Sequence, residues 1–153
     1  MKKQILILIQ VLAVFGLLFL LSCNKDKKED ENISIGKSYQ GGKIFYIDDT
    51  GKHGLIAAPS DEIGRYTWDE AISVCDSKVL DGYSDWYLPS KNELYELYLK
   101  KGSVGGFSQE YYWSSSEDST DSAWYQYFIN GVQGNDYYAR KDDTFRVRAI
   151  RAF

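Results

Sequence analysis

Three consecutive hydroxyl side chains, Ser114 to Ser116, lie between aromatic residues and Glu117 in the segment Tyr-Tyr-Trp-Ser-Ser-Ser-Glu. A serine acts as a nucleophile when a base lies within hydrogen-bond reach and a third group orients that base. The single histidine, His53, lies in a turn-like Gly-Lys-His-Gly segment, and no Gly-x-Ser-x-Gly elbow surrounds the serines. We therefore expect no enzymatic activity from this segment.

Metal chemistry has equally little material in this sequence. One histidine and two cysteines are present, and they do not have the spacing of zinc ligands. The loop from Glu117 to Ser122 is rich in oxygen atoms, which Ca²⁺ prefers, but its spacing matches no calcium-loop motif. A solvated acidic loop explains the same residues. We expect no metal site and no cofactor, and calcium binding by this loop stays open.

Aromatic residues interleaved with short polar ones are better material for binding a ligand. Rigid rings provide contact area at a small entropic cost, and the polar side chains between them hydrogen-bond to hydroxyl or amide groups. Strand alternation places Trp124, Gln126 and Phe128 on one face, with Tyr125, Tyr127 and Ile129 on the other, and one face must fill the core. Burial in the core is the alternative interpretation for Trp113 and Trp124. The aromatic candidates are Trp124, Tyr125, Tyr127, Tyr137 and Tyr138, and the four tyrosines are expected to be exposed.

Basic residues follow this aromatic segment. Arg140, Lys141, Arg146 and Arg148 form a local basic edge in an otherwise acidic protein. Guanidinium groups pair bidentately with sulfate or carboxylate, so Arg140, Arg146 and Arg148 are candidate ligand-binding residues. Two alternatives stay open, namely a solvated strand face and structural pairing with carboxylates such as Asp85.

The N-terminus has the pattern of an export signal. Lys2 and Lys3 precede an apolar run from Ile5 to Leu21, which ends in Leu-Leu-Ser-Cys at Cys23. This ending resembles the lipobox of bacterial lipoproteins, which implies cleavage after residue 22 and lipidation of Cys23. A retained anchor helix is the alternative, and the run is at the lower limit for spanning a bilayer.

The segment after Cys23 has the composition of a solvated tether. Asn24 to Asn32 contains no apolar residue. Its Lys28-Glu29-Asp30 resembles the charged signal that sends some lipoproteins to the outer face of the cell, and a run that only keeps the tether soluble is the alternative. Loss of Lys2 and Lys3 with the signal peptide would take the formal charge from −4 to −6, so nucleic-acid binding is not expected. Cys75 would then be the only cysteine within the domain, which excludes an internal disulfide.

The elements that must position these side chains are two helices and several short strands. Thr67-x-x-Glu70 and Ser90-x-x-Glu93 are capping boxes that predict the helix starts. Helical spacing makes Cys75 a small core residue. Strands are indicated around both helices, and Asn130-Gly131 is typical of a type I′ hairpin. This order of elements predicts an α+β fold.

Several stretches together resemble the DUF1566 family, also called the Lcl C-terminal domain, over residues 36–153. They are Gly-Lys-Ile-Phe-Tyr-Ile-Asp from Gly42, His-Gly-Leu-Ile-Ala-Ala from His53, Asp-Trp-Tyr-Leu-Pro-Ser from Asp85 with Glu93-Leu94, Tyr-Trp-Ser-Ser-Ser-Glu from Tyr112, Ala123-Trp124 and Val-Arg-Ala-Ile-Arg from Val147. The resemblance implies a C-type-lectin-like fold, with two helices packed on a small, mostly antiparallel, twisted sheet. Arg148 and Arg151 belong to the matching segments, which favours a structural role for both.

The resemblance also implies binding, because the adhesin that gives the family its name attaches to sulfated glycosaminoglycans. The Glu-Pro-Asn and Gln-Pro-Asp triplets of calcium-dependent lectins are absent, so calcium-mediated sugar binding is not expected. We expect a signal peptide (1–22), a lipidated tether (23–35) and a binding domain (36–153) in an outer-membrane lipoprotein displayed on the cell. Its expected partner is a glycan or a host or matrix component. The alternative is an envelope assembly component that binds another protein.

Overall fold

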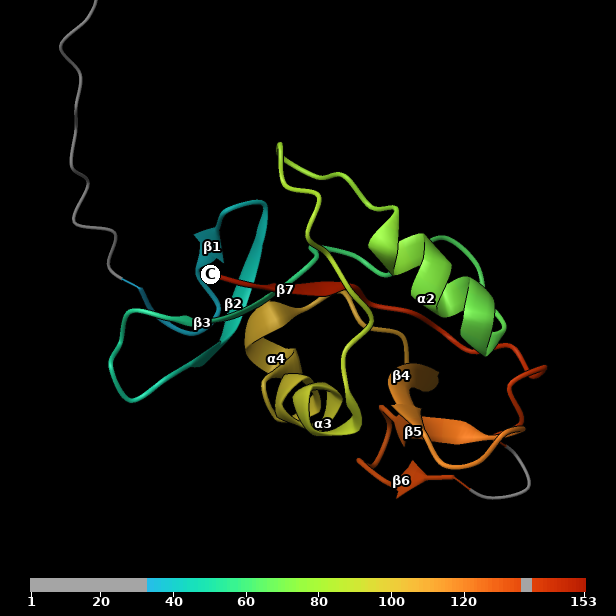
Figure 1. The fold of residues 1–153 in the computed structure, drawn as a ribbon. Helices are drawn as coiled ribbons and strands as arrows, with labels where there is room; N and C mark the ends of the chain where they lie inside the picture. The colour runs from blue at the N-terminus through green and yellow to red at the C-terminus, as the bar shows by residue number, and fades with distance from the viewer. Residues whose placement is uncertain (1–32, 136–138) are drawn as a thin grey trace, which may run out of the picture. The chain divides into compact units, whose positions relative to one another are not determined.

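The computed structural model describes residues 33–135 and 139–153, which form an α+β domain (Figure 1). In chain order its elements are β1 (Ser38–Tyr39), β2 (Gly42–Ile47), β3 (Gly54–Ala57), α2 (Trp68–Asp76), α3 (Lys91–Leu99), α4 (Lys101–Val104), β4 (Tyr111–Glu117), β5 (Ala123–Tyr127), β6 (Gln133–Gly134) and β7 (Ile150–Ala152). The predicted α+β class is confirmed. The predicted layout differs in detail, because the described residues contain a third, short helix, α4, and two separate sheets.

Both sheets are antiparallel. The first has the order β1-β2-β3-β7, so the C-terminal strand pairs beside β3, and the second has the order β4-β5-β6. The ring of Phe153 meets the ring of Tyr39 edge-on at 4.9 Å. This contact joins the two ends of the domain, and pairing with β3 holds β7 in the sheet.

The helices begin where their capping boxes predict. In α2, the Thr67 N–H donates to the Glu70 carboxylate at 2.9 Å. In α3, the Ser90 N–H donates to the Glu93 carboxylate at 2.8 Å, and the Glu93 N–H donates back to the Ser90 hydroxyl at 3.4 Å. These reciprocal bonds satisfy backbone donors that the first helical turn leaves unpaired.

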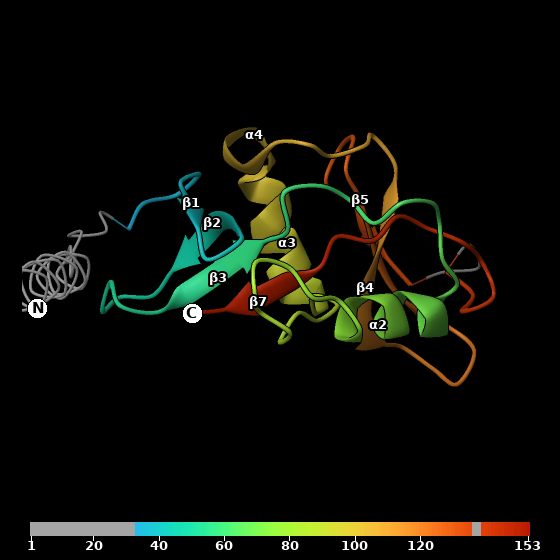
Figure 2. The same ribbon diagram turned by 90° about the horizontal axis from the view of Figure 1, so that it is seen from above.

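The first sheet lies between two apolar clusters. One contains Ile44 and Ile56 with the buried side of α2, and the other contains Phe45 and Ala57 with the buried side of α3. Strand β7 runs between α2 and α3 in Figure 1 and again in Figure 2. Cys75 is fully buried in the first cluster, as its helical spacing predicts.

The hairpin between β5 and β6 forms, but not with the predicted two-residue turn. A type I′ turn needs a positive φ at both central residues, and only Gly131, at 83°, has one. The Gly131 N–H donates to the Tyr127 carbonyl, and the Tyr127 N–H donates to the Val132 carbonyl. The longer turn places Gly131 against the ring of Tyr98 on α3, where a Cβ would lie 2.5 Å from a ring carbon. Close packing on α3 therefore sets the turn geometry.

No helix among the described residues has the length and apolar character needed to cross a bilayer. The apolar run at the N-terminus and Cys23 lie outside those residues.

One fully buried amide in β5 leads to a stability prediction. The side chain of Gln126 is 0% exposed, and neither its nitrogen nor its oxygen has a hydrogen-bond partner among the described residues. A buried polar group without a partner costs about 1–3 kcal/mol, and a similar apolar side chain removes that cost. We expect Gln126→Met to stabilise the domain by about 1 kcal/mol, measured as a higher urea midpoint at an unchanged m-value.

Gln133→Met is the matched control for this prediction. The Gln133 amide donates to the Lys91 carbonyl at 2.6 Å and so connects β6 to the start of α3. Loss of a satisfied hydrogen bond should lower the midpoint instead. If Gln126→Met also lowers the midpoint, the Gln126 amide makes a stabilising polar contact and the prediction is wrong.

Candidate binding surface

The pairing of β4 with β5 decides which aromatic rings are exposed. Tyr111 lies opposite Tyr127, and Trp113 lies opposite Tyr125, so these four residues share one face of the second sheet. Trp113 is 0% exposed and Tyr125 is 7% exposed, and both belong to the core cluster that contains α2. Tyr111, at the end of the strand pair, is 40% exposed, and Tyr127 is half-buried. The face is therefore core in its inner half and surface in its outer half.

The two outer tyrosines form a stacked pair. Their ring centroids lie 4.3 Å apart with an interplanar angle of 21°. Phe145 lies 5.4 Å from Tyr111, and the buried Tyr125 supports Tyr111 edge-on at 5.2 Å. We name Tyr111, Tyr127 and Phe145 the tyrosine surface. Because each ring is held by another ring, this surface loses little conformational freedom when a ligand binds.

A charged rim borders the tyrosine surface. Glu110 precedes Tyr111 and accepts from Arg146 at 3.0 and 3.3 Å, and it also pairs with Arg65. Arg146 donates further to the Gly64 carbonyl at 3.2 Å, which fixes the loop that carries Arg65. The hydrogen bonds from Arg146 hold the pKa of Glu110 below its usual value. Two guanidinium groups thus share one carboxylate, and the rim has a net positive charge.

An exposed apolar side chain extends the same rim. Ile63 is 96% exposed and lies in the loop just before Gly64 and Arg65. The tyrosine surface and its rim therefore combine aromatic planes, fixed cations and one apolar contact. This combination can hold a ligand without covalent chemistry.

The profile of the Lcl C-terminal domain matches residues 47–151, which include α2, α3 and the whole second sheet. The chain belongs to the Lcl C-terminal domain family. A search of curated proteins found no match to it.

Within this Lcl C-terminal domain, the prediction for Arg148 as a ligand-binding residue is wrong. The Arg148 side chain is 1% exposed, and its Nε donates to Asp61 at 2.8 Å. Its Nη1 donates to the Ala58 carbonyl at 2.9 Å, and the guanidinium lies on the ring of Phe107 at 4.0 Å. The residue is enclosed because the chain before β7 passes through the interior of the domain.

The expectation that Tyr125 is exposed is also wrong. Gly134 of β6 lies opposite Tyr125 and leaves room for its ring, since a Cβ on Gly134 would lie 2.5 Å from the tyrosine oxygen. The strand β6 and Phe145 cover the ring. Tyr125 therefore supports the tyrosine surface from below.

The other predicted candidates lie apart from one another. Trp124 is half-buried with the Lys91 ammonium 4.0 Å from its ring centroid. Arg140 is exposed and pairs with Asp142 at 3.0 Å, whereas Arg146 pairs with Glu110. The predicted basic edge is thus divided among separate ion pairs. Asp85, the carboxylate suggested as a partner for this edge, pairs instead with Arg151 at 2.6 Å. Tyr137, Tyr138 and Cys23 lie outside the described residues.

Sequence reasoning did not select Tyr111, Arg65, Glu110 or Ile63. Strand alternation from Trp113 places Tyr111 on the same face, and this signal could have identified it. The register of Tyr111 with Tyr127 depends on the connection between β4 and β5 and on the shift between Trp113 and Glu117. Arg65 and Ile63 had no local signal, because a loop residue acquires its neighbours only in the folded chain.

Hydroxyl groups in the segment from Ser114 to Ser116 form hydrogen bonds within the fold. The Ser114 hydroxyl donates to the Trp124 carbonyl at 2.8 Å, and the Ser116 hydroxyl accepts from the Lys91 N–H at the start of α3. In the nearby acidic loop, the Lys141 ammonium donates to Glu117 and to the Thr120 carbonyl. Among the described residues, no group of three or more histidine, cysteine or acidic side chains is placed to hold a metal ion.

Proposed function

We propose that this Lcl C-terminal domain is the binding domain of a lipid-anchored, outer-membrane protein displayed on the cell, and that it recognises a glycan noncovalently. The stacked pair Tyr111–Tyr127 is the observation that carries the proposal, because pre-ordered and partly exposed aromatic rings suit contact with the apolar faces of sugar rings. Its fold would be of the C-type-lectin-like kind. The α+β order and the two antiparallel sheets are compatible with that assignment.

The charged rim supports a preference for glycans with sulfate or carboxylate groups. Arg65 has a side chain that is 51% exposed, so part of its guanidinium stays available beyond its pair with Glu110. Guanidinium binds such anions bidentately. The adhesive role implied by the family resemblance is consistent with this chemistry.

A glycan panel tests the proposal with the full-length protein purified in an uncharged detergent. Sulfated, carboxylated and neutral glycans are immobilised side by side, and retention of the wild type is compared with that of Tyr127→Ala and Tyr111→Ala. We expect each variant to bind at least about tenfold more weakly, which corresponds to roughly 1.4 kcal/mol for loss of an aromatic anchor. Binding to a sulfated glycan should also weaken as salt is added.

Tyr95→Ala is the matched control for the panel, because Tyr95 is 42% exposed but lies on α3. Equal losses in Tyr95→Ala and Tyr127→Ala would reject the tyrosine surface as the site. Retention by none of the glycans would reject glycan recognition.

Ile63 favours a second candidate function, assembly of the envelope through another protein. A 96% exposed isoleucine two residues before Arg65 of the rim is typical of a protein contact more than of a sugar contact. Crosslinking on intact cells that captures one protein partner, with Ile63→Ser reducing the capture and the glycan panel silent, would support this candidate.

A further inference from the structure

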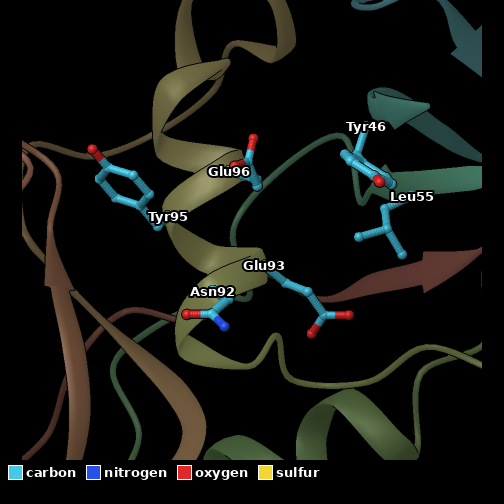
Figure 3. A pocket seen from close by; sticks show the side chains of 6 residues that line it. All are labelled: Tyr46, Leu55, Asn92, Glu93, Tyr95 and Glu96. Atoms are coloured by element: carbon cyan, nitrogen blue, oxygen red, sulfur yellow. The ribbon is translucent and has the colours of Figure 1, made fainter. Parts of the chain in front are cut away.

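A groove separate from the tyrosine surface lies between the first sheet and α3. It has a volume of about 450 Å³ and is lined by Tyr46, Leu55, Asn92, Glu93, Tyr95 and Glu96. Figure 3 shows Tyr46 and Leu55 on one side and α3 on the other, with Glu93 and Glu96 projecting from the side of the helix nearer to Tyr46. The ring of Tyr95 projects from the opposite side of the helix, so Tyr46 and Leu55 supply the apolar wall.

An irregularity in β2 creates this wall. The register with β3 shifts between Ile44 and Tyr46, which leaves Phe45 as an extra residue in β2. Without the shift, Tyr46 would share the face of Ile44 by strand alternation. With it, Tyr46 lies opposite Leu55 and faces α3, and its side chain is 42% exposed. The bulge therefore directs the Tyr46 ring toward the groove, and Tyr46 belongs to neither of the two apolar core clusters.

The polar side of the groove has one carboxylate that the fold does not use. Glu93 is engaged, because its oxygens accept from the Tyr87 hydroxyl at 2.9 Å and from the Ser90 hydroxyl at 2.7 Å. The Glu96 side chain has no hydrogen bond or ion pair with any other described residue. None of the six lining residues is basic. Both carboxylates thus leave the groove with a negative charge that no lining residue neutralises.

We propose that this groove docks a basic segment of a partner protein, with one lysine or arginine side chain lying along Tyr46 and pairing with Glu96. The aliphatic part of such a side chain suits Leu55, the tyrosine ring attracts its cation, and the carboxylate completes the contact. The charge is opposite in sign to that of the rim beside the tyrosine surface. The same domain therefore offers two surfaces that select different ligands.

Binding of short peptides tests this proposal with the full-length protein in an uncharged detergent. Fluorescently labelled tetra-arginine and tetra-lysine are titrated, and their binding is followed by fluorescence anisotropy. A glycine-serine peptide and a tetra-glutamate peptide serve as negative controls. We expect the cationic peptides alone to bind. Glu96→Gln and Tyr46→Ala should each weaken this binding by roughly tenfold, since each removes one of the two attractive groups.

Asp76→Asn is the matched control, because Asp76 is an exposed carboxylate at the end of α2 and outside the groove. It should leave peptide binding unchanged. A loss in Asp76→Asn equal to that in Glu96→Gln would show only general attraction to an acidic protein and would overturn the proposal. So would stronger binding of a neutral glycan, or of a second copy of this chain, at the groove in place of the cationic peptides.

The outcome is independent of the proposed glycan recognition. Glu96→Gln should leave retention on the glycan panel unchanged, and Tyr127→Ala should leave peptide binding unchanged. A variant that weakens both activities would have to be checked for unfolding by its urea midpoint, and a folded variant of that kind would contradict the two-surface arrangement.

Discussion

Arg148→Ala is expected to destabilise the domain by about 3–5 kcal/mol, the cost of removing one partner from a buried ion pair. The change leaves Asp61 without its guanidinium while Asp61 still accepts from the Tyr112 hydroxyl at 2.6 Å. It also leaves the Ala58, Gly105 and Gly106 carbonyls without their donor. A loss of this size is a large part of the roughly 5–15 kcal/mol that stabilises a typical domain.

Urea denaturation followed by circular dichroism measures this effect. Arg148→Lys should also be destabilising, because an ammonium cannot reach the three carbonyls and the carboxylate in the geometry of a planar guanidinium. Arg140→Ala is the matched control, since its pair with Asp142 is exposed and screened by solvent, and its loss should leave the urea midpoint nearly unchanged. If Arg148→Ala denatures at the wild-type midpoint, the buried network does not stabilise the domain.

Cys23→Ala is expected either to release the protein from the membrane fraction or to block its processing, because the proposed lipid anchor needs Cys23. Each buried methylene of an acyl chain contributes roughly 0.8 kcal/mol, so several chains anchor stably where one holds only marginally. Without the Cys23 sulfur no acyl chain can be attached there. Membrane fractionation and incorporation of a labelled fatty acid measure the change, and the unprocessed chain should migrate as a larger species.

Cys75→Ala is the matched control for the anchor. Cys75 is fully buried in α2, and this burial raises the pKa of its thiol. A buried neutral thiol is unreactive, so its loss should change neither fractionation nor labelling. If Cys23→Ala stays in the membrane fraction at unchanged size, the lipoprotein proposal fails and a retained N-terminal helix becomes the better explanation.

The two proposed binding surfaces carry opposite charges. The rim of Arg65, Glu110 and Arg146 has a net positive charge, and the groove beside Tyr46 has a negative one. An anionic glycan is attracted to the first and repelled by the second, and a basic peptide has the reverse preference. The two proposals can therefore be tested in one preparation with two ligands of opposite charge, and added salt should weaken the binding of both.

The sequence by itself determined the features that depend on near neighbours. The helix starts at Thr67 and Ser90 follow from capping boxes whose partners lie three residues apart. The burial of Cys75 follows from helical periodicity, and the order of the matching segments identified the family. Each of these signals is contained in a short stretch of chain, so no knowledge of the fold was needed.

Only the tertiary structure decided which aromatic and basic residues reach the surface. Arg146 and Arg148 are two residues apart and would share a face in a regular strand, but β7 begins only at Ile150. Their acidic partners, Glu110 and Asp61, lie 36 and 87 residues away, and those distant carboxylates place one arginine on the rim and the other in the interior. Likewise, Tyr125 is buried because β6 and Phe145 cover it, whereas no residue of β6 pairs with Tyr127. Burial depends on contacts between distant segments, and periodicity in one segment cannot report which side of it those contacts will cover.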